Sequence, residues 1–162
     1  MALDTQLAGI KVLESQRAGI EIDFSWQHAL KIAILARRSD LIRQCAQKWV
    51  SARDLWVFTD DSTRHDGYQY LGWADLIDGN IDAAADNLRR SGDFMNAPTL
   101  RSFGSSTALA DALLKKDRYA DVIAWLEKVR GHWEPEICDE WLTQLKKKIH
   151  PSDENWIGQF GY

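Results

Sequence analysis

Residues 70–92 of this 162-residue chain, YLGWADLIDGNIDAAADNLRRSG, decide the fold. Small and apolar residues recur every three or four positions on both sides of the pair Gly79-Asn80, which is the spacing of a buried helix face. Glycine followed by asparagine is a signal for a tight turn. The stretch therefore predicts two helices, at about 67–78 and 81–90, that pack against each other across that turn.

The same pattern returns 38 residues further along the chain, where helices are expected at about 106–116 and 118–130. The shift aligns six small or apolar positions: Leu71 with Leu109, Gly72 with Ala110, Leu76 with Leu114, Ile81 with Tyr119, Ala85 with Ile123, and Leu88 with Leu126. Repetition at this period is typical of stacked helical hairpins.

The first copy also resembles a tetratricopeptide repeat. The residues that carry the resemblance are Leu71, Gly72, Gly79, Ala84 and Leu88. The small residues Gly72 and Ala84 would allow the two helices to approach closely. The chain departs from the family in its spacing of 38 residues, in Asp75 where an aromatic residue is usual, and in a long connection over 93–104 that contains Pro98 and Gly104. The resemblance implies an array of helical hairpins that is not fully regular.

Helices are also expected over 3–18, from Asp23 or Ser25 onward, over 39–58 and over 136–149. The segment TDDSTRHDG at 59–67 is expected to be a polar turn. We therefore predict an all-α fold of about eight helices stacked as antiparallel hairpins, either a tetratricopeptide-like α-solenoid or an irregular orthogonal bundle.

One domain is expected over 1–162, because a chain of this length forms a single core. Within it we expect N-terminal helices over 3–60, two similar hairpins over 67–130, and a C-terminal helix with a docked tail over 136–162. Most of the eight tryptophans are expected in the core. The two cysteines are expected to be reduced and buried. The sequence has no signal peptide and no apolar segment long enough to span a membrane, so we expect the protein in the cytoplasm, without membrane contact.

The net charge of −4 is unevenly distributed. Residues 56–112 hold nine acidic and four basic side chains. An acidic centre disfavours direct nucleic-acid binding, which needs basic surface, and suits a basic protein partner. The candidate partner-binding residues are Asp60, Asp61, Asp66, Trp73, Asp75, Asp78, Asp82 and Asp86. The alternative is a solvated polar face, and the sequence leaves both interpretations open.

Residues 101–110, RSFGSSTALA, raise the question of a serine nucleophile. The sequence also allows an anion site formed by Arg101 and the helix start at Gly104 to Ser106. The alternative is a joint between hairpins, in which Ser105 or Ser106 caps a helix, Gly104 permits a turn and Phe103 enters the core. The joint is favoured because the nucleophile elbow G-x-S-x-G and its preceding strand are both missing.

Two further clusters contain side chains that can bind a metal ion or exchange a proton. One is Asp60, Asp61, His65 and Asp66, and the other is His132, Glu134, Cys138 and Asp139. Neither has the ligand spacing of a known metal motif. We expect no catalytic, cofactor or metal site, and no enzymatic activity.

Four stretches resemble small all-helical bacterial immunity proteins, which act against secreted toxins. They are GWADLIDGNIDAAADNLRRSG (72–92), LRSFG (100–104), LADALL (109–114) and VIAWLEKVRGHW (122–133). The resemblance implies an antitoxin that covers the active site or substrate-binding surface of a basic toxin such as a nuclease. The alternatives are a tetratricopeptide-like adaptor for a peptide or protein, and a small hydrolase using Ser105, Ser106 or the Asp60–Asp66 region. The sequence leaves the partner's identity and the oligomeric state open.

Overall fold

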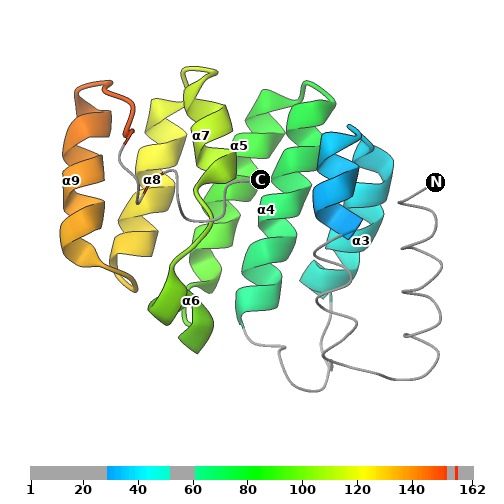
Figure 1. Ribbon diagram of the computed structural model, residues 1–162, viewed down its shortest axis with the longest axis horizontal. Coiled ribbons are helices and arrows are strands. Elements are labelled where there is room, and N and C mark those ends of the chain that lie inside the picture. The colour runs from blue at the N-terminus through cyan, green and yellow to red at the C-terminus, as the bar shows by residue number, and fades with distance from the viewer. Residues whose placement is uncertain (1–28, 52–60, 153–155, 157–162) are drawn as a thin grey trace.

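The computed structural model describes residues 29–51, 61–152 and 156, and every regular element within them is a helix (Figure 1). This confirms the all-α prediction for the described part of the chain. Residues 29–35 are helical. They are followed by α3 (Ser39–Ser51), α4 (Asp61–Ile77), α5 (Ile81–Ser91), the 3₁₀ helix η1 (Gly92–Phe94), α6 (Pro98–Phe103), α7 (Ala108–Leu114), α8 (Tyr119–Arg130) and α9 (Pro135–Lys146). The expected helix at 3–18, the helix start expected at Asp23 or Ser25, and residues 52–58 of the helix expected at 39–58 lie outside the described residues.

The helices stand beside one another in a row that extends from α3 to α9 (Figure 1). α3 contacts α4, α4 contacts α5, α5 contacts α8, and α8 contacts α9. α7 packs against both α5 and α8. The order of helices in space therefore largely follows their order in the chain.

The buried apolar side chains form two clusters. The larger runs from α5 to α9 and includes Trp125, Trp133, Trp141 and Trp156. The smaller joins residues 29–33 to α3 and α4 and includes Trp49. These five tryptophans are therefore confirmed as core residues. Cys45 and Cys138 are buried and belong to no disulfide, as predicted.

Gly72 lies where α4 meets both α5 and α7. A Cβ atom placed on it would lie 2.4 Å from Leu109 Cδ2 and 3.2 Å from the carbonyl oxygen of Ala84. Real Cβ atoms essentially never show a contact under 3.0 Å. A side chain at this position would therefore force Leu109 to move and press on the backbone of Ala84, which is the close approach expected from the small residues Gly72 and Ala84.

One backbone turn recurs at four places in the described residues. Its central residue has a positive φ: Arg37 (53°), Gly79 (82°), Asp117 (59°) and Lys148 (56°). In each case that residue's N–H donates to the carbonyl three residues earlier, and the next N–H donates to the carbonyl five residues earlier. This is the hydrogen-bond pattern of a Schellman helix end. Gly79 and Asp117 are 38 residues apart, so the shift found in the sequence also holds for the backbone.

The predicted polar turn at 59–67 is wrong from residue 61 onward, because α4 begins at Asp61. His65 and Gln69 lie on the buried side of the first turns of this helix. Their polar groups have partners in the interior, so polar composition does not end the helix. Asp61 in the first turn is also favoured by the helix dipole.

The connection at 93–104 contains η1 and α6, and α6 begins with Pro98 at a position where a proline is tolerated. The predicted helices at 106–116 and 136–149 are too long, because α7 covers Ala108–Leu114 and α9 ends at Lys146. Two turns limit the lengths of these helices. Gly104, with a φ of 75°, ends α6 shortly before α7, and Lys148, in a left-handed conformation, follows the end of α9.

Of the helices in these described ranges, none combines the length and the apolar character that a membrane crossing needs.

Candidate functional site

Asp75 lies inside the structure and joins three helices. It is 6% exposed. Its Oδ1 accepts a hydrogen bond from Arg43 Nη1 of α3 at 2.8 Å, and its Oδ2 accepts one from Asn87 Nδ2 of α5 at 2.7 Å. The side chain is therefore part of the packing between α3, α4 and α5.

Asp78, Asp82 and Asp86 are exposed, and each has a basic partner. Asp78 pairs with Arg43 at 2.7 Å, Asp82 with Arg118, and Asp86 with Arg89. Hydrogen bonds from Ser39 and Arg43 lower the pKa of Asp78. Arginines of α3, of α5 itself and of the start of α8 thus neutralise part of the acidic charge that the sequence concentrates in the centre of the chain.

Three of the remaining predicted residues, Asp61, Asp66 and Trp73, lie on α4. Asp61 and Asp66 are half-buried in its first two turns, and Trp73 is half-buried against the larger apolar cluster. Asp60 lies outside the described residues. At a rise of about 1.5 Å per residue, Asp61 and Asp78 are about 25 Å apart along the helix. The predicted set is therefore divided between the two ends of α4.

A buried polar cluster joins α4 to the segment between α6 and α7. Ser105 and His65 form a hydrogen bond of 2.6 Å between Oγ and Nε2, and His65 Nδ1 lies 2.8 Å from the carbonyl oxygen of Ser91. A carbonyl only accepts, so Nδ1 carries the hydrogen and Nε2 accepts from the serine hydroxyl. Gln69 Nε2 also donates to Ser105 Oγ at 3.3 Å. Desolvation lowers the pKa of His65 to about 4, so the imidazole is neutral at pH 7.

A serine hydrogen-bonded to a histidine is the arrangement of an activated nucleophile. Here, however, His65 is 0% exposed and Ser105 is 3% exposed. A substrate carbonyl cannot reach the hydroxyl without displacing the packing around it. The cluster therefore ties the start of α4 to the break between α6 and α7.

The structure corrects three details of the predicted joint. Thr107 is the N-cap residue of α7, without a side-chain capping bond, and Ser105 points to His65 instead. Ser106 Oγ accepts only a long hydrogen bond, 3.4 Å, from the N–H of Ala108. Phe103 does not enter the core, because 66% of it is exposed. The sequence could not pair His65 with Ser105, since they are 40 residues apart and share no local motif.

The second predicted cluster does not converge on a metal position. Cys138 is buried, its Sγ donates to the carbonyl oxygen of Trp133 at 3.4 Å, and burial raises the pKa of the thiol to about 12. Asp139 forms an ion pair with Arg130. Within the described ranges, no three His, Cys, Asp or Glu side chains are placed to hold a metal ion.

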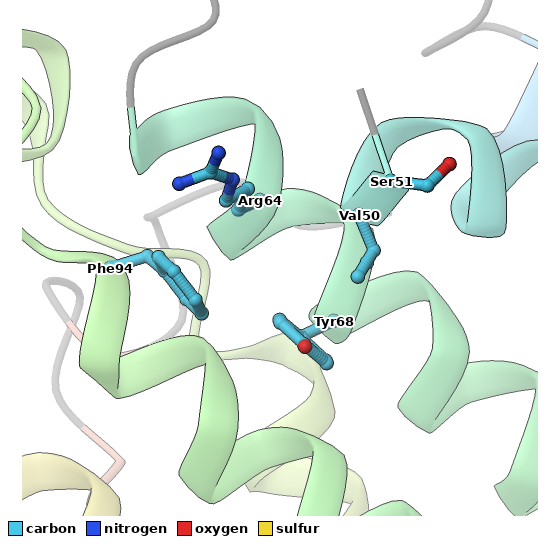
Figure 2. A pocket seen from close by; sticks show the side chains of 5 residues that line it. All are labelled: Val50, Ser51, Arg64, Tyr68 and Phe94. Atoms are coloured by element: carbon cyan, nitrogen blue, oxygen red, sulfur yellow. The ribbon is translucent and has the colours of Figure 1, made fainter. Parts of the chain in front are cut away.

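An open pocket of about 300 Å³ lies between the end of α3, the start of α4 and η1. It is lined by Val50, Ser51, Arg64, Tyr68 and Phe94, as Figure 2 shows. The rings of Tyr68 and Phe94 are stacked, with centroids 5.5 Å apart and planes 13° apart. The guanidinium carbon of Arg64 lies 5.8 Å from the centroid of Phe94. The sequence carries no local signal for this pocket, because its residues come from three separate segments.

No family model, curated protein or solved structure matches this chain.

Proposed function

We propose that this chain is a non-catalytic protein-binding protein, built as a tetratricopeptide-like array of antiparallel helical hairpins. The observation that carries the proposal is the helix end repeated at Arg37, Gly79, Asp117 and Lys148. Three of these turns lead within two residues into the next helix, α3, α5 or α8. Arrays of helix pairs usually present an extended surface to a protein partner.

The buried Ser105–His65 pair supports a function without catalysis. It has the hydrogen bond that nucleophilic chemistry needs, yet both side chains are removed from solvent. A reacting group must also be reachable by its substrate. The pair is more simply explained as a structural contact between α4 and the segment before α7.

We propose that the partner is a basic protein. Our specific proposal is a toxin domain, which this chain binds and blocks as an immunity protein. The side chains of Asp82 and Asp86 are 92% and 57% exposed. Exposed ion pairs contribute little free energy. A basic partner can therefore take these carboxylates from Arg118 and Arg89 at small cost, and opposite charge speeds association.

Co-purification from the native cell, followed by binding kinetics, tests this proposal. The variant Asp82→Lys/Asp86→Lys reverses two exposed acids of α5. The matched control, Glu136→Lys/Glu140→Lys, reverses two exposed acids with the same spacing on α9. We expect the α5 variant to associate with the recovered partner at least about tenfold more slowly at low salt, and the difference to shrink in 0.5 M salt, about three times the physiological ionic strength. Equal rates for the two variants, or an acidic partner, would contradict the proposal.

A peptide-holding adaptor is the second candidate, favoured by the open pocket at the start of α4. That pocket is lined by an arginine and two stacked aromatic rings. Aromatic and arginine side chains are enriched among the residues that dominate binding energy. The pocket lies at the opposite end of α4 from Asp78, so each candidate uses a different surface.

A further inference from the structure

Arg64 differs from every other half-buried arginine of the described residues. Arg43, Arg89 and Arg118 each hold two aspartates. Arg64, which is equally half-buried, makes no ion pair within the described ranges, and its interaction there is with the ring of Phe94. A partly desolvated guanidinium is stabilised by an anion that replaces its lost hydration. Among the residues that the structure describes, this guanidinium therefore has no counter-ion.

The rest of the pocket offers apolar surface beside that charge. The stacked rings of Tyr68 and Phe94 form one flat side, and Val50 adds aliphatic surface (Figure 2). About 300 Å³ lies at the small end of the usual range for ligand pockets. This space suits one or two side chains of a partner, with the charged group at Arg64 and an apolar group against the rings.

The charge around the pocket selects among anions. The chain carries a net charge of −4, and Asp61 and Asp66 belong to the same α4 that forms the pocket, whereas Asp93 of η1 is paired with Lys128. These charges repel a polyphosphate or a nucleic acid, which binds through many phosphates at once. A single carboxylate meets the guanidinium with much less of this repulsion.

We propose that this pocket binds an acidic side chain of a protein partner, presented next to an apolar or aromatic residue. The carboxylate pairs with the Arg64 guanidinium, and the neighbouring apolar side chain packs on Tyr68 and Phe94. The inference rests on the second candidate function, a peptide adaptor. It does not depend on the acidic residues of α5.

The test is an NMR titration of the full chain with two short peptides, capped at both ends, that contain Phe-Glu or Phe-Gln. We expect the Phe-Glu peptide to shift the ring resonances of Tyr68 and Phe94 and to bind at least about tenfold more tightly than Phe-Gln, as for a hydrogen bond to a charged group. Arg64→Met should remove this preference. Arg90→Met, at an exposed arginine of α5, is the matched control and should keep it.

A second variant keeps the test decisive if Arg64→Met fails to fold. Ser51→Glu places a carboxylate on an exposed pocket residue, where it can occupy Arg64 and should abolish peptide binding. Acetate and inorganic phosphate are titrated as free anions. Either of them binding as tightly as the Phe-Glu peptide would overturn a peptide site.

Peptide binding that does not depend on Arg64 would show that the inference about this pocket is wrong, although the proposal of a peptide adaptor would stand. If neither peptide binds, the pocket inference is wrong. The proposal of a basic protein partner is judged separately, by co-purification and the α5 variants.

Discussion

We call the helix pairs α4–α5 and α7–α8 units and compare them through the turn that each contains. Their turns have the same hydrogen bonds, and Gly79 and Asp117 occupy the same left-handed position. Their first helices differ, because α4 has 17 residues and α7 has seven. Where α4 has residues 61–69 before the part that corresponds to α7, the second unit has a break at Gly104 and the separate short helix α6.

This difference is where the buried His65–Ser105 contact and one side of the pocket lie. The first turns of α4, which have no counterpart in α7, carry Arg64, His65 and Tyr68, and the break before α7 supplies Ser105. The part that corresponds in the two units contains the tight turn and mostly apolar packing, with Asp75 as a buried polar residue of the first unit. The buried contact and the pocket therefore depend on what distinguishes the two units.

The largest expected effect is at the contact between the two units. Gly72→Leu should cost about 4 kcal/mol or more, because its side chain would overlap Leu109 and the backbone of Ala84. Urea unfolding followed by circular dichroism measures this loss. Gly131→Ala is the control, since its Cβ would come no closer than 3.4 Å to the carbonyl oxygen of Lys128. A Gly72→Leu protein as stable as this control would show that the units are not packed this closely.

Acid should weaken the longer unit through His65, whose pKa is lowered to about 4 by burial. Between pH 6.5, the ordinary pKa of histidine, and pH 4, the histidine is protonated in the unfolded chain but neutral in the folded one. The free energy of unfolding therefore falls as the pH falls. The loss should reach about 3 kcal/mol at pH 4. Urea titrations at several pH values measure it, with His65→Gln as the comparison. The same slope between pH 6.5 and 4 in both proteins would exclude His65 as the cause.

The two ends of α4 should respond differently to the loss of an arginine. Arg43→Ala removes the cation beside the buried Asp75 and should cost about 2 kcal/mol. Arg64→Ala loses only its contact with Phe94 and should cost about 0.5 kcal/mol. Thermal or urea unfolding of the two variants compares these costs. A larger loss for Arg64→Ala would mean that the pocket arginine has a structural role.

Replacing each of the two adjacent serines by alanine compares the cost of losing a buried hydrogen bond with that of losing a hydrogen bond near the surface. Ser105→Ala should cost about 1.5 kcal/mol, because His65 Nε2 loses its nearest donor inside the protein. Ser106→Ala should cost less than about 0.5 kcal/mol, since its hydroxyl makes only a long bond at the start of α7. Chemical denaturation of both variants at pH 7 is the measurement. Equal costs would contradict the role assigned to Ser105.

The smallest effect concerns the repeated turn. Asp117→Gly should stabilise the second unit by about 0.5 to 1 kcal/mol, because glycine adopts a positive φ without the penalty of a Cβ atom. Gly79→Ala should destabilise the first unit by about 1 kcal/mol for the converse reason. Differential scanning calorimetry of both proteins compares the turns. A destabilised Asp117→Gly would show that the aspartate side chain matters more than the backbone.

The sequence by itself determined the helical class, the 38-residue shift, the turns at Gly79 and near Asp117, and that most of the tryptophans enter the core. These features depend on periodicity and on residues that are neighbours in the chain, so a single sequence contains their signal. The tertiary structure decided where α4 begins, which acids are paired, and that His65 meets Ser105. Each of these depends on groups 22 to 40 residues apart, such as Gln69 with Ser91, Arg43 with Asp75 and His65 with Ser105. A polar side chain looks the same in the sequence whether its partner is water or a buried group from another helix, and only packing decides between them.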